Sequence, residues 1–326
     1  MKNKLISLVS LLLCVIIVLS SCSYKPIEPS ERDLTVVGQV NGKDVYLEEL
    51  IFVTYTYRDI LTAKYGEDIF DGDEAEKYLE MLKELVYANI TSGYAALFLC
   101  EENYIGLGED AILSRVDEKL NEMVTELGGM GKYKKYLKEN HLTDHFLRRT
   151  VELQLLENEL MYIYIDDIHL IENDDEKIYD IIKDEFISVR HIFIPYSDKA
   201  AEDNISFAYD RLMSGAEFSE VLASYGKDDE MTAEGLIIPR GYMSDEYQSV
   251  ALELGEGELS EVIKSDMGYY IIQRLSISPA SIMLQFDYLK DLYQAYAFYA
   301  LIDQKQLSLF FTPNEIGEEY MRSPFK

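Results

Sequence analysis

The sequence of 326 residues has no tryptophan and only three cysteines, at positions 14, 22 and 100. So few cysteines exclude a disulfide-bonded framework. Cys100 lies in an apolar run, where we expect a small buried side chain rather than a nucleophile. Cysteine–histidine spacings typical of zinc sites and a glycine-rich phosphate loop are both absent from the sequence. The sequence therefore predicts no metal and no cofactor.

Basic residues are also scarce, with 30 Lys and Arg against 60 Asp and Glu, for a formal charge of −30. This charge argues against nucleic acid as a partner, because binding of nucleic acid requires a basic face. Two interpretations of the acidic surface stay open: colloidal repulsion that keeps the protein soluble, or attraction of basic, unfolded client chains. The length predicts two domains, and 48% hydrophobic residues are enough for a sizeable core.

The N-terminus has the pattern of an export signal over residues 1–21: two lysines, an apolar run and then small residues. The run is too short for a full membrane span. Leu19-Ser20-Ser21-Cys22 resembles a bacterial lipobox, which implies cleavage before Cys22 and a diacylglycerol group on its sulfur. An ordinary signal peptide and an uncleaved anchor are the alternatives. Residues 22–33 contain two prolines and several charges, which predicts an extended tether.

A β-hairpin and a series of helices are predicted after the tether. Residues 35–40 and 43–46 flank Asn41-Gly42, a pair that accepts positive φ at both central positions of a tight turn. Apolar residues then recur at helical spacing. The first predicted helix begins at Leu47. Four more are predicted over residues 73–102, 109–127, 133–138 and 143–165.

The stretch from 187 to 276 predicts a small α/β domain. Residues 188–194 form an apolar run that indicates a buried strand with one histidine, His191. Residues 267–273 are rich in β-branched and aromatic side chains and indicate a second strand. Two short amphipathic helices and a charged loop with glycines are expected between these strands.

The order of these pieces resembles a parvulin-type peptidyl-prolyl isomerase domain. The matching pieces are 190–194, 212–218, 222–225, Asp228, 240–243, 252–260 and the strand at Gly268. The resemblance implies a small antiparallel sheet flanked by helices, and an enzyme that interconverts the cis and trans forms of X-Pro bonds.

Prolyl isomerisation breaks no covalent bond, because its barrier of about 18–20 kcal/mol comes from amide resonance. The reaction needs an apolar slot for the proline ring and polar groups that favour the twisted amide. The resemblance implies three catalytic residues: His191, Asp228 and Tyr270. It implies four residues of the substrate pocket: Leu236, Met243, Tyr247 and Ser265.

The sequence departs from the parvulin pattern at three places. Tyr270 stands where the family has its second histidine, and Tyr247 stands where it usually has phenylalanine. The usual Gly-Gly pair appears as Glu234-Gly235. An active isomerase and a non-catalytic chaperone with a parvulin-like binding module therefore both stay open.

Residues 34–175 resemble the helical N-terminal domain of SurA/PrsA-type foldases, and residues 279–326 are predicted to be helical again. In such foldases the C-terminal segment packs onto the N-terminal domain, which implies an α+β fold with residues 187–276 as an inserted domain. With the lipobox, this resemblance implies a lipid-anchored protein on the extracytoplasmic face of a bacterial membrane that binds unfolded exported polypeptides. A surface lipoprotein that binds a small solute is a third hypothesis, although the repeated βαβ pattern of such folds is absent.

Overall fold

The computed structural model describes residues 24–265 and 267–325, so the predicted leader and Cys22 lie outside the described residues. The described chain divides into two compact units. Residues 170–297 form an α/β unit, and residues 24–169 together with 298–325 form a helical unit. The predicted α+β fold with small antiparallel sheets is confirmed. Each helix within the described ranges is too short or too polar to cross a bilayer.

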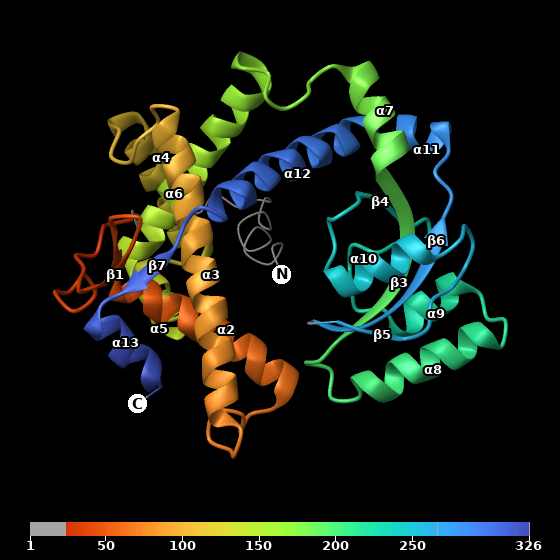
Figure 1. The fold of residues 1–326 in the computed structure, drawn as a ribbon, viewed down its shortest axis with the longest axis horizontal. Helices are drawn as coiled ribbons and strands as arrows, with labels where there is room; N and C mark the ends of the chain where they lie inside the picture. Colours follow the sequence, from red (N-terminus) through yellow and green to blue (C-terminus); the bar gives the residue numbers. More distant parts are fainter. Residues whose placement is uncertain (1–23, 266, 326) are drawn as a thin grey trace. The chain divides into compact units, whose positions relative to one another are not determined.

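The helical unit contains a three-stranded antiparallel sheet in the order β2-β1-β7 (Figure 1). The predicted hairpin is confirmed: β1 (Val36–Val40) and β2 (Lys43–Tyr46) meet at Asn41 and Gly42, which have φ values of 46° and 88°. β7 (Phe311–Pro313) comes from the far end of the chain and pairs with β1. Three residues are too few for a strand to show a periodic pattern, so β7 was not predicted.

Six α-helices of the helical unit begin and end close to residues that favour helix ends, such as capping residues and glycines. Thr143, for example, accepts a hydrogen bond from the Phe146 N–H at 3.0 Å and caps the following helix, as its residue type favours. Cys100 is buried, as predicted. The helices are α2 (Leu47–Tyr65), α3 (Ala75–Glu102), α4 (Asp110–Glu126), α5 (Met130–Glu139), α6 (Asp144–Tyr162) and α13 (Glu315–Arg322).

Gly38 in β1 lies where β7 leaves no room for a side chain. A Cβ atom there would lie 2.6 Å from a Phe311 ring carbon and 2.6 Å from the Thr312 carbonyl oxygen. We expect Gly38→Ala to lower the free energy of unfolding by about 1–3 kcal/mol, because the C-terminal strand must shift away. Denaturant unfolding measures this change.

Gly93→Ala in α3 is the matched control, because Gly93 is exposed and a Cβ there meets no heavy atom within 4 Å. It should raise the free energy of unfolding by about 0.5–1 kcal/mol through the better helix propensity of alanine. Equal effects of the two substitutions would contradict the close approach of β7 to β1.

The α/β unit is built around a four-stranded antiparallel sheet in the order β4-β3-β6-β5 (Figure 1). Its strands are β3 (Phe186–Pro195), β4 (Leu236–Pro239), β5 (Ile263–Lys264) and β6 (Gly268–Leu275). Its helices are α7 (Asp175–Glu185), α8 (Ala201–Met213), α9 (Phe218–Tyr225), α10 (Asp245–Glu253) and α11 (Pro279–Leu284). The long α12 (Phe286–Gln306) belongs to this unit up to residue 297 and to the helical unit from residue 298.

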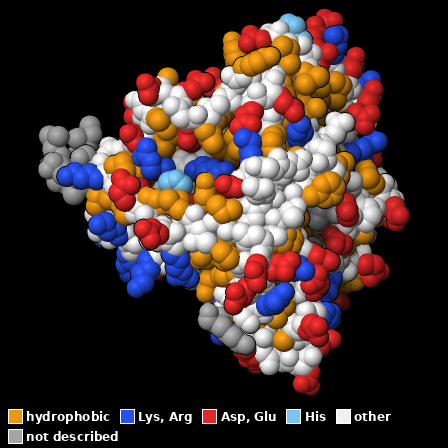
Figure 2. Space-filling model, turned by 60° about the vertical axis from the view of Figure 1, so that its left-hand side comes forward, with side chains coloured by type: hydrophobic (Ala, Val, Ile, Leu, Met, Phe, Trp, Pro, Cys, Tyr) orange, Lys and Arg blue, Asp and Glu red, His pale blue; other side chains and the backbone are white. Residues whose placement is uncertain are grey.

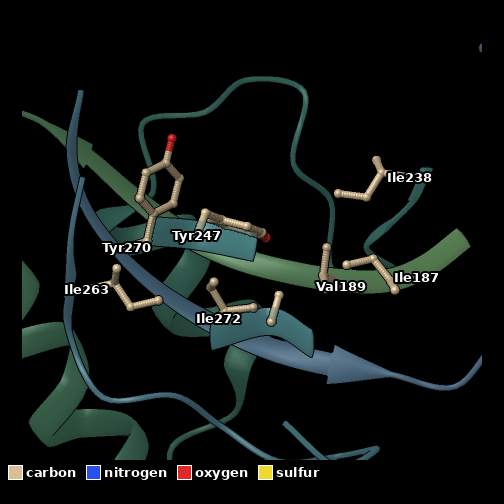
Figure 3. Packing of buried hydrophobic residues seen from close by; sticks show 8 residues of the cluster. Ile187, Val189, Ile238, Tyr247, Ile263, Tyr270 and Ile272 are labelled. Carbon is tan, nitrogen blue, oxygen red and sulfur yellow. The ribbon is translucent and has the colours of Figure 1, made fainter. Parts of the chain in front are cut away.

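The two faces of this sheet carry different cores because side chains alternate along β3. Ile192 and Ile194 point to the face that α8 and α9 cover, where they pack with Ile205 and Val221. Val189, His191 and Phe193 have the opposite parity, and Val189 packs with Tyr247 of α10 on the other face (Figure 3).

Helix α10 and strands β4 and β5 were not predicted, although α10 has a recognisable start. Ser244 precedes Asp245 and Glu246, and its hydroxyl accepts a hydrogen bond from the Tyr247 N–H at 3.4 Å. A serine followed by acidic residues is a helix-start signal. The helix therefore places Tyr247 in its first turn, with the side chain buried against the sheet.

Candidate active site

His191 is the centre of the candidate site, and its side chain is 2% exposed. Its Nε2 lies 2.9 Å from Asp228 Oδ2, and its Nδ1 lies 3.0 Å from the Tyr247 hydroxyl. An ionised carboxylate can only accept hydrogen bonds, so Nε2 carries a proton. In the neutral imidazole Nδ1 then accepts the proton of the Tyr247 hydroxyl. Both ring nitrogens are thereby satisfied in one tautomer.

Asp228 stands in the loop after α9 and is held as a carboxylate. The hydrogen bond from His191 lowers its pKa below the ordinary 3.8, and this effect outweighs the opposing effect of partial burial. Its second oxygen accepts a hydrogen bond from the Glu230 N–H at 3.0 Å. The site thus places a fixed negative charge beside an imidazole that is held in place through both of its ring nitrogens.

The stability contributed by Asp228 should depend on pH in one direction. A carboxyl whose pKa is lowered by folding contributes its full stability above the unfolded pKa and loses it as the pH falls through the folded pKa. We expect the difference in unfolding free energy between the wild type and Asp228→Asn to be constant between pH 7 and about pH 5. Below 3.8 the difference should shrink. Denaturant titrations across this pH range measure the difference. If it grows on acidification, the Asp228 carboxylate is not stabilised by its bond to His191.

The loop that carries Asp228 is fastened to the sheet at two points. The Lys227 N–H donates to the Phe193 carbonyl at 2.9 Å. On the opposite face of β3, Arg190 Nη1 donates to the Ala233 carbonyl at 2.7 Å, and its guanidinium lies 4.4 Å from the centre of the Phe218 ring. Two neighbouring residues of β3 therefore position the loop: His191 bonds the Asp228 carboxylate, and Arg190 bonds the backbone of the loop at Ala233.

Tyr270 reaches His191 from β6, on the same face of the sheet. The edge-to-face ring contacts of Tyr270 with His191 and with Tyr247 have centroid separations of 5.1 Å each. Phe193 stacks on Tyr270 at 4.5 Å. Burial raises the pKa values of the Tyr247 and Tyr270 hydroxyls, so both remain neutral. Figure 3 shows the Tyr270 hydroxyl directed away from the aliphatic side chains around its ring.

Apolar side chains border this polar network. Leu236 and Met243 are partly buried and pack against the cluster that contains Tyr247 and Tyr270. A hollow of about 360 Å³ adjoins Asp228 and is lined in part by Leu222 and Met231. The arrangement therefore offers an apolar surface, a fixed carboxylate and an oriented imidazole within one small region.

Three predicted site residues, Asp228, Tyr247 and Tyr270, contact His191. Leu236 and Met243 pack against the cluster that contains the two tyrosines, and Ser265 has a different environment. Ser265 lies in the turn between β5 and β6, where its hydroxyl donates to the Gly268 carbonyl at 3.0 Å and accepts from the Met267 N–H at 3.1 Å. Its hydroxyl thus holds the turn before the strand of Tyr270. A role in the substrate pocket stays a prediction.

Two departures from the parvulin pattern, Tyr247 and Tyr270, meet at His191, and the bond of the Tyr247 hydroxyl was not predicted. Tyr247 is predicted as a pocket wall, yet its hydroxyl is the partner of His191 Nδ1. Phenylalanine at this position would lack that hydroxyl. Phe193 was also missed, although its position two residues after His191 in a strand places it on the same face.

A family model described as "Rotamase: PPIC-type PPIASE domain" matches residues 191–276. Among curated proteins, the chain is 28% identical over 286 residues to the foldase protein PrsA of Caldanaerobacter subterraneus, covering 85% of this chain and 84% of that protein. It is 24% identical over 275 residues to PrsA of Clostridium perfringens, covering 79% of this chain and 78% of that protein.

Among solved structures, the match to PrsA of Streptococcus pneumoniae covers 84% of this chain and 92% of that chain, with 14% identity and a TM-score of 0.35. The match to PrsA of Bacillus subtilis covers 85% and 93%, with 18% identity and a TM-score of 0.30. The prediction of a parvulin-type peptidyl-prolyl isomerase is confirmed by the family model. Residues 191–276 thus form a PpiC-type peptidyl-prolyl cis-trans isomerase domain, in a chain that is similar to PrsA foldases over most of its length.

Proposed function

We propose that this protein is an extracytoplasmic foldase, anchored to the membrane by lipid on Cys22, that isomerises X-Pro bonds in exported polypeptides and chaperones them while they fold. The observation that carries the proposal is the bonded set of His191, Asp228 and Tyr247 beside apolar Met243 and Leu236. The similarity to PrsA foldases along the chain and the lipobox support the setting outside the cytoplasm.

The proposed catalysis acts on amide resonance. The planar amide has negative charge on its oxygen and positive charge on its nitrogen, and the twisted amide loses this separation. An apolar slot at Met243 and Tyr247 would solvate the charge-separated form poorly. The carboxylate of Asp228 beside the carbonyl would oppose negative charge on that oxygen. Both effects favour the twisted state over the planar one, as catalysis requires.

A proline-limited refolding reaction tests the enzyme. A soluble chain of residues 23–326 should accelerate the slow phase of a client whose refolding waits for an X-Pro bond, which uncatalysed takes tens to hundreds of seconds. The readout is the rate constant of that phase against enzyme concentration. If the wild-type chain leaves the rate constant unchanged, the proposed isomerase activity is wrong.

The second candidate is a non-catalytic chaperone, and the tyrosine at position 270 favours it because tyrosine cannot titrate near neutral pH as histidine does. This candidate predicts that the chain suppresses client aggregation without changing the slow refolding phase. Running the aggregation assay beside the refolding assay separates the two functions. Tyr270→His would then leave both readouts unchanged.

The lipid anchor has its own test. Growth of the bacterial host with a labelled fatty acid should label the wild-type chain and leave Cys22→Ala unlabelled. Two or three acyl chains hold a protein on a bilayer, whereas one chain alone is marginal. Label on the Cys22→Ala variant would contradict the anchor.

A further inference from the structure

Helix α5 concentrates positive charge in a protein that is otherwise strongly acidic. Its ten residues contain four lysines and one acidic residue, whereas the whole chain has twice as many acidic as basic residues. Tyr133 and Leu137 are the buried side chains of the helix and turn toward the core of the helical unit. All four lysines are exposed, and we call them the lysine face: Lys132, Lys134, Lys135 and Lys138.

The charge of the lysine face is mostly unneutralised. Lys135 forms an ion pair with Glu139 at 3.4 Å. The other three lysines have no ion pair with any residue in the described part of the chain. Two acidic residues of α4 pair with other basic residues, since Asp117 pairs with Arg148 at 2.5 Å and Glu122 pairs with Lys119 at 3.2 Å. Glu118 and Glu126 of α4 are exposed and form no ion pair with these lysines in the described part of the chain. On the face drawn in Figure 2, basic side chains gather toward the left of the view.

The first described residues of the chain are bonded beside α5. The Tyr24 hydroxyl donates to Asp144 Oδ2 at 2.8 Å, and the Ile27 N–H donates to the same oxygen at 2.9 Å. The Tyr24 N–H donates to Asn121 Oδ1 at 2.9 Å. Tyr133 of α5 donates to the other oxygen of Asp144 at 2.6 Å. The chain after the proposed anchor is therefore fastened to the helical unit.

Rings add to this attachment. The Tyr24 and Tyr133 rings meet edge to face with centroids 6.0 Å apart, and Arg148 Nη1 donates to the Tyr24 hydroxyl at 2.9 Å. Cys22 precedes Tyr24 by two residues, which span at most about 7 Å in any conformation. An acyl group on Cys22 must then enter the bilayer close to α5.

We propose that the lysine face of α5 binds anionic phospholipid headgroups of the membrane that holds the acylated Cys22, and so sets one orientation of the helical unit on the bilayer. This inference rests on the proposed lipid anchor. The acyl chains supply retention on the membrane. Each lysine near an anionic surface favours the bound orientation by about fivefold. Electrostatic interactions between exposed charges extend only about 8 Å at physiological salt. The acidic residues elsewhere on the protein are therefore screened from the anionic headgroups at the lysine face.

The acylated mature protein, reconstituted on vesicles, tests this orientation. One set of vesicles contains only phosphatidylcholine, and the other contains phosphatidylglycerol mixed with it. Acetylation by an amine-reactive reagent, read by mass spectrometry, reports the exposure of each lysine. On the anionic vesicles the lysine face should react about fivefold or more slowly than on the neutral ones. Exposed Lys77, Lys183 and Lys199 should react equally on both.

A triple variant shows which lysines are responsible. Lys132→Gln, Lys134→Gln and Lys138→Gln together leave Lys135 as a reporter, and its protection on anionic vesicles should disappear. The matched control changes Lys77, Lys183 and Lys199 to Gln, with the same change of charge, and should keep the protection. If the chains float with both kinds of vesicle but the lysine face is acetylated equally on both, the orientation is wrong and the lipid anchor stands. Chains that float with neither would overturn the anchor and the inference together.

Discussion

Asp228→Ala is expected to lower kcat/KM for prolyl isomerisation by about a hundredfold, the effect typical of removing one preorganised polar group. The carboxylate accepts the Nε2 proton of His191 at 2.9 Å, and its low pKa keeps it charged at neutral pH. Its removal takes away both the negative charge that we propose lies beside the substrate carbonyl and the acceptor of the His191 Nε2 proton. The slow phase of proline-limited refolding measures the loss.

Glu230→Ala is the control for this substitution. Glu230 is exposed and lies two residues away, so its replacement removes the same charge from the same loop. Its backbone N–H still donates to Asp228. This control should keep the rate within about threefold, since a surface charge contributes little at this range. Similar losses in both variants would mean that the net charge of the loop matters, and not the bond to His191.

Tyr247→Ala is expected to lower the free energy of unfolding of the α/β unit by about 3–5 kcal/mol, the range found when a buried aromatic side chain is truncated. Its side chain is among the largest that are fully buried, and it packs on Val189 and Ile272 of the sheet. The substitution also removes the hydroxyl bonded to His191 Nδ1. Calorimetry or denaturant unfolding measures the loss.

Tyr247→Phe separates the hydroxyl from the ring. It keeps the packing and leaves His191 Nδ1 without a partner in a buried site, which costs about 1–3 kcal/mol. Tyr225→Phe, at a half-exposed position at the end of α9, should change stability by no more than about 0.5 kcal/mol. Equal stability of Tyr247→Phe and wild type would show that the bond to His191 contributes nothing.

Much of the site was predictable because its residues belong to a series with an order and spacing. His191 stands in an apolar strand, and Met243 and Asp228 follow at recognisable positions along residues 190–268. The parity of residues along β3 also determines which side chains share a face with His191. The spacing of residues in the sequence does not show which atoms of different elements come into contact. The bond between Tyr247 of α10 and His191 of β3 is an example.

The strands that were not predicted are short. β4, β5 and β7 have four, two and three residues, so their alternation cannot be told from chance. They are strands because a longer neighbour offers them backbone hydrogen bonds: β3 for β4, β6 for β5 and β1 for β7. The environment of Ser265 has the same origin, since a tight turn uses its hydroxyl for backbone groups.

The sequence by itself determined the α+β class, the series of helices, the parvulin order and the charge of −30, because periodicity, turn residues and composition are local properties. Tertiary structure alone decided three things: that Tyr247 bonds His191, that β7 pairs with β1, and that Tyr24 packs against Tyr133 of α5. Each joins residues far apart in the chain. Contacts of this kind depend on how packed elements meet, and no local pattern records them.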